Sequence, residues 1–198
     1  MNSKLINIIF LSTFLFASTP PSGGYDNGSS AGKGNWDISL TWNPFNYFKQ
    51  GQSYMVVGYG LTNRIDINGY YSAANNGGNN YYGGLSYQFI DTKFLDLSTA
   101  VGLRAYTDNS NLNLFLPQLL YTVKFSDRIR LGGSFVDIRS QNLEVSKGIA
   151  SDVFLMVKIY ENDKYKINIT AGGFNPVLWE PENGEWYPTY SIDIKFKK

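Results

Sequence analysis

Neither cysteine nor histidine occurs in the 198 residues of this chain, and only 17% of its residues are charged. The absence of cysteine excludes disulfides and cysteine-ligated zinc or iron–sulfur sites. The absence of histidine excludes a Ser-His-Asp triad and a histidine metal site. A formal net charge of +1 gives no general attraction to nucleic acid. The sequence therefore predicts a protein that is not an enzyme, with no cofactor, no metal site and no nucleic-acid partner.

The chain begins with the pattern of a targeting segment. Lys4 precedes an apolar run over residues 5–16, and the small residues Ala17-Ser18-Thr19 follow it. A charged start, a short apolar run and a small-residue exit are typical of a secretory signal peptide, and the run is too short for a membrane-spanning helix. The expected parts are a signal peptide over 1–19, a flexible Gly/Ser/Pro-rich lead-in over 20–34 and a β-barrel domain over 35–198.

Apolar and polar residues alternate from residue 35 onward, as in the run WDISL over 36–40. Strict alternation predicts β-strands with one apolar and one polar face. We expect about ten strands, with eight to twelve left open, because most match the length of a tilted membrane-spanning strand. The expected strands are 35–42, 53–62, 64–72, 81–90, 94–107, 114–125, 128–138, 150–160, 164–174 and 187–196.

The connections between these strands alternate in length. Those after the even-numbered strands are tight, as at residues 62–63 and 126–127, whereas those after the odd-numbered strands are long. Short turns on one rim and long loops on the other are typical of outer-membrane barrels. The predicted fold class is all-β, a closed antiparallel up-and-down transmembrane β-barrel.

The composition of the two strand faces bears on which face is inside. A soluble lipocalin-like barrel turns its apolar residues inward, whereas a membrane barrel turns them toward lipid. All five glutamates of the chain fall in expected loops or turns, and the apolar faces of the clearest strands carry no charge. This favours the membrane barrel. A secreted soluble lipocalin-like barrel that binds an apolar ligand stays as the alternative.

Two short motifs carry a family resemblance. The final strand, Tyr190-x-Ile192-x-Ile194-x-Phe196, resembles the C-terminal signal read by the outer-membrane assembly machinery, although two lysines follow it. Residues 58–66 (GYGLTNRID) resemble a strand–turn–strand run common in bacterial outer-membrane β-barrel proteins. In strand number the chain is similar to the omptin proteases, whose catalytic histidine it lacks. The resemblance implies the outer membrane of a Gram-negative cell envelope, with outer-membrane lipid and the assembly machinery as partners.

Inward-pointing polar faces would divide the charges between two walls of the lumen. The expected acidic wall near the short-turn rim is Asp37, Asp66 and Asp96. The expected basic wall is Lys124, Arg130, Lys158, Lys166 and Lys195. Nearer the other rim the lumen would hold Tyr54, Tyr70, Tyr82, Arg104 and Tyr106. Trp179 and Trp186 are the candidates for a surface ligand in a long loop.

Two functions fit such a lumen. Charges that pair across it would plug it, which leaves a structural or surface-display role. A water-filled charged constriction would instead give porin-like passage of small polar solutes. An envelope enzyme that uses carboxylates alone is a third hypothesis, although the sequence contains no convincing catalytic pair.

Overall fold

The structure is a computed structural model that describes residues 27–43, 52–73, 79–107, 112–140, 147–175 and 186–198. Its strands are β1 (Trp36–Asn43), β2 (Gln52–Gly60), β3 (Ile65–Ala73), β4 (Asn80–Asp91), β5 (Leu95–Tyr106), β6 (Leu112–Lys124), β7 (Ile129–Ser140), β8 (Lys147–Glu161), β9 (Tyr165–Asn175) and β10 (Tyr187–Phe196). The prediction of ten strands is confirmed. Among the described residues no helix has the length and apolar character needed to cross a bilayer.

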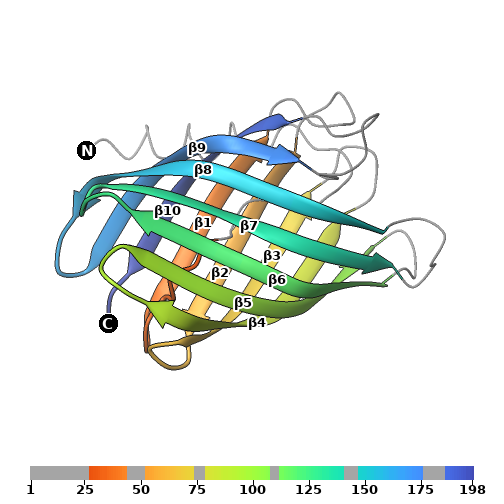
Figure 1. The fold of residues 1–198 in the computed structure, drawn as a ribbon, viewed down its shortest axis with the longest axis horizontal. Coiled ribbons are helices and arrows are strands. Elements are labelled where there is room, and N and C mark those ends of the chain that lie inside the picture. The colour runs from red at the N-terminus through yellow and green to blue at the C-terminus, as the bar shows by residue number, and fades with distance from the viewer. Residues whose placement is uncertain (1–26, 44–51, 74–78, 108–111, 141–146, 176–185) are drawn as a thin grey trace.

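The ten strands form one closed antiparallel barrel in which each strand pairs with its neighbours in sequence (Figure 1). Closure comes from β1, which pairs with β2 on one side and with β10 on the other. The register at the closure sets Asp37 opposite Lys195 and Ser39 opposite Asp193. Because partners in an antiparallel pair share a face, these polar residues point the same way.

A repeated hydrogen-bond pattern forms the four short turns. A side-chain oxygen at the start of each turn accepts the backbone N–H of the residue three positions later, over distances of 2.8–3.1 Å. The four acceptors are Thr62, Thr92, Ser126 and Asn162. Hydroxyl and amide side chains favour this local geometry, which reverses the chain in a few residues. The short turns lie together at one rim of the barrel (Figure 1).

The faces of the strands are inverted relative to a soluble barrel. Large apolar side chains lie on the outer surface, including Ile67, Leu85, Val101, Leu119, Leu155 and Ile169, each more than 40% exposed. Buried positions are mostly polar, and the largest of the fully buried side chains are Gln118, Asn80, Asn175, Thr122, Asp96, Ser72 and Ser134. The expected outward orientation of apolar residues is confirmed. The alternative of a soluble barrel with an apolar interior is therefore wrong.

Aromatic side chains are exposed at both ends of the barrel wall. Trp36, Phe94, Phe125, Tyr160 and Phe196 lie at the short-turn rim, and each is at least 42% exposed. Trp42, Tyr81, Trp186 and Tyr190 lie toward the opposite rim and are 45–48% exposed. Amphipathic rings at two levels are what the two headgroup regions of a bilayer favour.

Candidate functional site in the barrel lumen

Residues 27–35 precede β1; residues 27–31 lie against the inner faces of the strands, and the exposed Lys33 is at the rim. The backbone N–H of Gly28 donates to Thr122 Oγ1 at 3.0 Å, and Ser98 Oγ donates to the Gly28 carbonyl at 2.7 Å. Both hydroxyls belong to the inner faces of β5 and β6. The segment thus runs along the inner surface of the barrel wall. We refer to residues 27–35 as the lumen segment.

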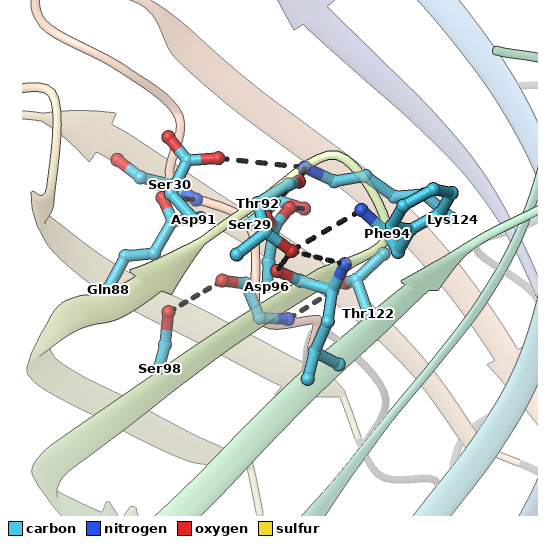
Figure 2. A network of polar contacts seen from close by, with 12 residues as sticks. Ser29, Ser30, Gln88, Asp91, Thr92, Phe94, Asp96, Ser98, Thr122 and Lys124 are labelled. Atoms are coloured by element: carbon cyan, nitrogen blue, oxygen red, sulfur yellow. Dashed lines mark hydrogen bonds and ion pairs between the residues drawn. The ribbon is translucent and has the colours of Figure 1, made fainter.

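Two buried carboxylates hold the middle of the lumen segment. Asp66 accepts the hydroxyl of Ser30 at 2.7 Å and the backbone N–H of Ala31 at 2.9 Å. Asp96 accepts the hydroxyl of Ser29 through Oδ2, as Figure 2 shows beside the ion pair on its other oxygen. These carboxylates are 5% and 1% exposed, so hydrogen bonds from the segment replace the water that they lose.

A glycine turn connects the lumen segment to the wall. Gly32 and Gly34 have φ values of +79° and +80°, a left-handed conformation that favours glycine. The N–H of Gly34 donates to the Gly60 carbonyl at 2.8 Å. A Cβ on Gly60 would collide with the Gly32 backbone, so β2 accepts the turn only at a residue without a side chain.

The structure describes the expected lead-in over 20–34 from residue 27 onward. Residues 27–34 are held by side-chain and backbone hydrogen bonds to β2, β3, β4, β5 and β6. Composition alone suggested a linker because Gly and Ser are small and flexible in isolation. Here the same small residues fit a narrow lumen. Residues 20–26 lie outside the described residues.

A layer of tyrosines fills the lumen toward the long-loop rim. Tyr54 meets Tyr70 edge-on with ring centroids 5.8 Å apart, and Tyr70 stacks on Tyr82 at 5.3 Å. All three rings are at most 5% exposed. Gln118 Nε2 donates to the Tyr82 hydroxyl at 2.8 Å. Nearby, Arg104 is buried with its guanidinium 5.3 Å from the half-buried Tyr106 ring.

Glycines in the wall make room for this layer. A Cβ at Gly102 would collide with the Tyr82 ring, and one at Gly84 would collide with the Tyr82 hydroxyl. The two glycines pair across β4 and β5. The barrel wall therefore carries a flat recess into which one tyrosine ring is packed, a use of strand glycine that relieves crowding.

The five cations expected on the basic wall have different surroundings. Lys124 forms an ion pair with Asp96 at 2.6 Å and lies 3.6 Å from Asp91. Lys158 pairs with Glu161, next to a register shift in β8 at the short-turn rim. The other three cations line the cavity described below; they are Arg130, Lys166 and Lys195.

A cavity of about 130 Å³ lies in the lumen. Of the expected acidic wall, Asp37 and Asp66 line it, whereas Asp96 faces the lumen segment and Lys124 instead. Asp193 from β10 also lines the cavity. The hydroxyl groups that hydrogen-bond to Asp193 come from β1, β9 and β10.

The loop candidates are not brought to this cavity. Trp179 lies outside the described residues. Trp186 is 48% exposed and packs over the backbone of Gly173 on the outside of the barrel. No group of three or more acidic side chains within the described ranges is arranged to hold a metal ion.

A lumen of polar and charged side chains inside a wall of exposed apolar residues defines a class: the fold is that of a bacterial outer-membrane β-barrel. Among solved structures the chain is similar to "KdgM porin in complex with disordered oligogalacturonate", with a TM-score of 0.50, 10% identity, and coverage of 83% of this chain and 99% of that one. A second structure, "KdgM porin", has a TM-score of 0.49, 11% identity, and coverage of 83% and 99%.

The designed transmembrane barrel TMB2.3 also matches, with a TM-score of 0.39, 14% identity, and coverage of 84% of this chain and 95% of that one. No protein-family model matches the chain, and no curated protein sequence matches it. At these identities the likeness concerns the fold.

Proposed function

We propose that the protein resides in the outer membrane as a porin-like, non-enzymatic barrel that passes small polar solutes, and that the lumen segment closes it in the state described here. The observation that carries this proposal is that a segment of the chain itself, and not the barrel wall, occupies part of the lumen. Near the short-turn rim the lumen is occupied by the protein's own residues 27–35, which lead directly into β1. A cavity lined by both charged and apolar side chains remains beside the segment.

The contacts of the lumen segment favour reversible displacement. They are hydrogen bonds to carboxylate, hydroxyl and amide groups, all of which water can hydrate when the segment leaves. Ala31 is the one buried apolar side chain of the segment. A hydrogen bond exchanged for water changes the free energy by only about 1 kcal/mol. The free-energy cost of a few such exchanges lies within the range measured for local opening in folded proteins.

A second candidate is a closed barrel with a structural or surface-display role. The tyrosine layer favours it, because Tyr54, Tyr70 and Tyr82 are buried and their rings pack one on the next along the adjacent strands β2, β3 and β4. Under this alternative the lumen stays shut when the lumen segment is removed.

Conductance separates the two candidates. The chain refolded from Pro20 and the chain refolded from Gly32 are compared in planar bilayers, the second retaining the Gly32–Gly34 turn but lacking residues 20–31. If the barrel passes small solutes, the shorter chain should show a higher open probability or unit conductance. Ions serve as the small solutes in this measurement. No current from either chain, with both barrels shown intact by their shifted migration on unheated gels, would sink the proposal in favour of the closed barrel.

Outer-membrane residence and assembly rest on the last strand. Tyr190, Ile192 and Phe196 of β10 face outward with exposures of 45%, 39% and 42%. Alternating outward-facing apolar residues at the C-terminus support a role of β10 as the signal for the assembly machinery. Fractionation of Phe196→Ser tests it: the variant is expected to accumulate unassembled, and an unchanged outer-membrane yield contradicts the role.

A further inference from the structure

Three carboxylates line the cavity, and two of them, Asp66 and Asp193, already accept hydrogen bonds, whereas Asp37 has only the 3.9 Å approach of Lys195. Asp193 accepts Ser39 Oγ at 2.6 Å and Ser191 Oγ at 2.9 Å through Oδ1, and Thr170 Oγ1 through Oδ2. Both oxygens of Asp66 are occupied by the lumen segment, as described above. Asp66 and Asp193 therefore offer few lone pairs to the cations across the cavity, and Asp37 is the one lining carboxylate that does not accept a hydrogen bond from a described residue.

The cations that line the same cavity are in the opposite condition. Lys195 donates to the Ser30 carbonyl at 3.1 Å, and its nearest carboxylate oxygen, on Asp37, is 3.9 Å away. No hydrogen bond or ion pair joins Arg130 or Lys166 to any residue that the structure describes. Three positively charged donors thus face one cavity with a single long ion pair among them.

Their arrangement follows from the barrel register. Lys166 is opposite Lys195 in the pairing of β9 with β10, so these two lysine side chains are neighbours on one face. Arg130 lines the same cavity from β7, and Asp37 lines it from β1, opposite Lys195. Like charges repel and are costly in a partly dehydrated lumen unless an anion or water lies between them. The unmet requirement of this cluster is for acceptors, not donors.

We infer that Arg130, Lys166 and Lys195 form a binding site for a small oxyanion, a carboxylate or phosphate, inside the lumen. The inference rests on the proposed function in that it names the class of solute. The guanidinium of Arg130 is planar, has five N–H donors and can bind two oxygens of such an anion at once. The ammonium groups of Lys166 and Lys195 would add charge-assisted hydrogen bonds.

The cavity sets the size of the anion. At about 130 Å³ it is slightly smaller than the cavity of roughly 150 Å³ that accommodates benzene in an engineered protein. Phosphate or a short dicarboxylate is within this size. A longer anionic chain would require the lumen segment to move, because Asn27, Ser29 and Ala31 form part of the cavity wall.

Calorimetric titration of the full mature chain in detergent, with inorganic phosphate and with succinate as probes, tests the site. Both Lys166→Gln and Arg130→Gln are expected to weaken binding about tenfold, the loss of one charge-assisted contact. Lys158→Gln is the matched control, because Lys158 was expected on the same wall but pairs with Glu161 and does not line the cavity. It should bind as the unaltered chain does. Unheated-gel migration checks that each variant is folded.

The inference is overturned if neither phosphate nor succinate binds. It is also overturned if Lys158→Gln loses as much affinity as Lys166→Gln and Arg130→Gln do. Binding without current in any chain supports the anion site and overturns passage. Current without binding, and without a reversal potential that indicates anion preference, overturns the anion site and leaves passage standing.

Discussion

The ammonium of Lys124 lies 2.6 Å from Oδ1 of Asp96, and this ion pair joins β6 to β5 inside the barrel (Figure 2). The other oxygen of Asp96 accepts the hydroxyl of Ser29. One buried carboxylate thus connects two wall strands and the lumen segment. Its loss should affect both the stability of the wall and the position of the segment.

Asp96→Asn is therefore expected to destabilise the barrel by about 2 kcal/mol, because it leaves the half-buried ammonium of Lys124 without its main counter-ion. The free energy of unfolding is measured by urea titration in lipid vesicles, followed by tryptophan fluorescence. Asp96→Asn/Lys124→Gln completes a double-mutant cycle and should recover about 1 kcal/mol of the loss. Strict additivity of the two single changes would contradict an energetic coupling between the residues.

The absence of cysteine allows a direct test of lumen-segment movement. In Ser30→Cys/Asp66→Cys the new thiols replace two side chains in hydrogen-bond contact at 2.7 Å. Oxidation should lock the segment to β3 and abolish single-channel openings, and a reductant should restore them in the same preparation. The oxidised and reduced forms of this variant differ only in one bond. Both lack the Asp66 charge, so the effect of losing that charge cancels when their currents are compared. Identical currents in the two states would mean that the segment does not close the path.

Strand periodicity made the placement of the lumen side chains predictable. A shift of one residue would turn every side chain of a strand to the other face, so alternation determines the orientation once one face is known to be apolar. This reasoning predicts that Tyr54, Tyr70 and Tyr82 point inward, and these three side chains are buried. It also indicated an inverted barrel, because the apolar face carried no charge that lipid would exclude.

Features that depend on contacts between distant residues were not predictable in this way. Residues 27–34 have the composition of a linker, and the residues that hold them in the lumen, such as Asp66, Asp96 and Thr122, lie dozens of positions away in the chain. Lys158 follows the inward alternation of β8, but the register shift between Lys158 and Tyr160 brings its ammonium to Glu161 at the rim. The bulge breaks the alternation after Lys158, so that the consecutive side chains of Ile159 and Tyr160 are both exposed.

The recess for Tyr82 predicts a contrast between two glycines of the same barrel region. Gly102→Ala would place a methyl group against the Tyr82 ring and is expected to destabilise the barrel by about 1–3 kcal/mol through overpacking. Gly83→Ala is the control, since an added Cβ there meets nothing within 4 Å, and it should leave stability unchanged or raise it by about 0.5 kcal/mol. Urea unfolding in vesicles measures both. Equal effects would show that the recess does not constrain the ring.

The outward orientation of Val101 predicts how the barrel responds to a charge at mid-wall. Val101 lies in the middle of β5 and is 43% exposed, with Ala100 beside it buried on the inner face. Val101→Arg would bring a cation into hydrocarbon and should reduce the free energy of folding into vesicles by about 2–4 kcal/mol. Val101→Leu is the matched control and should change it by less than about 1 kcal/mol. If the arginine variant folds into lipid as stably as the leucine variant, the face that carries Val101 does not meet the bilayer.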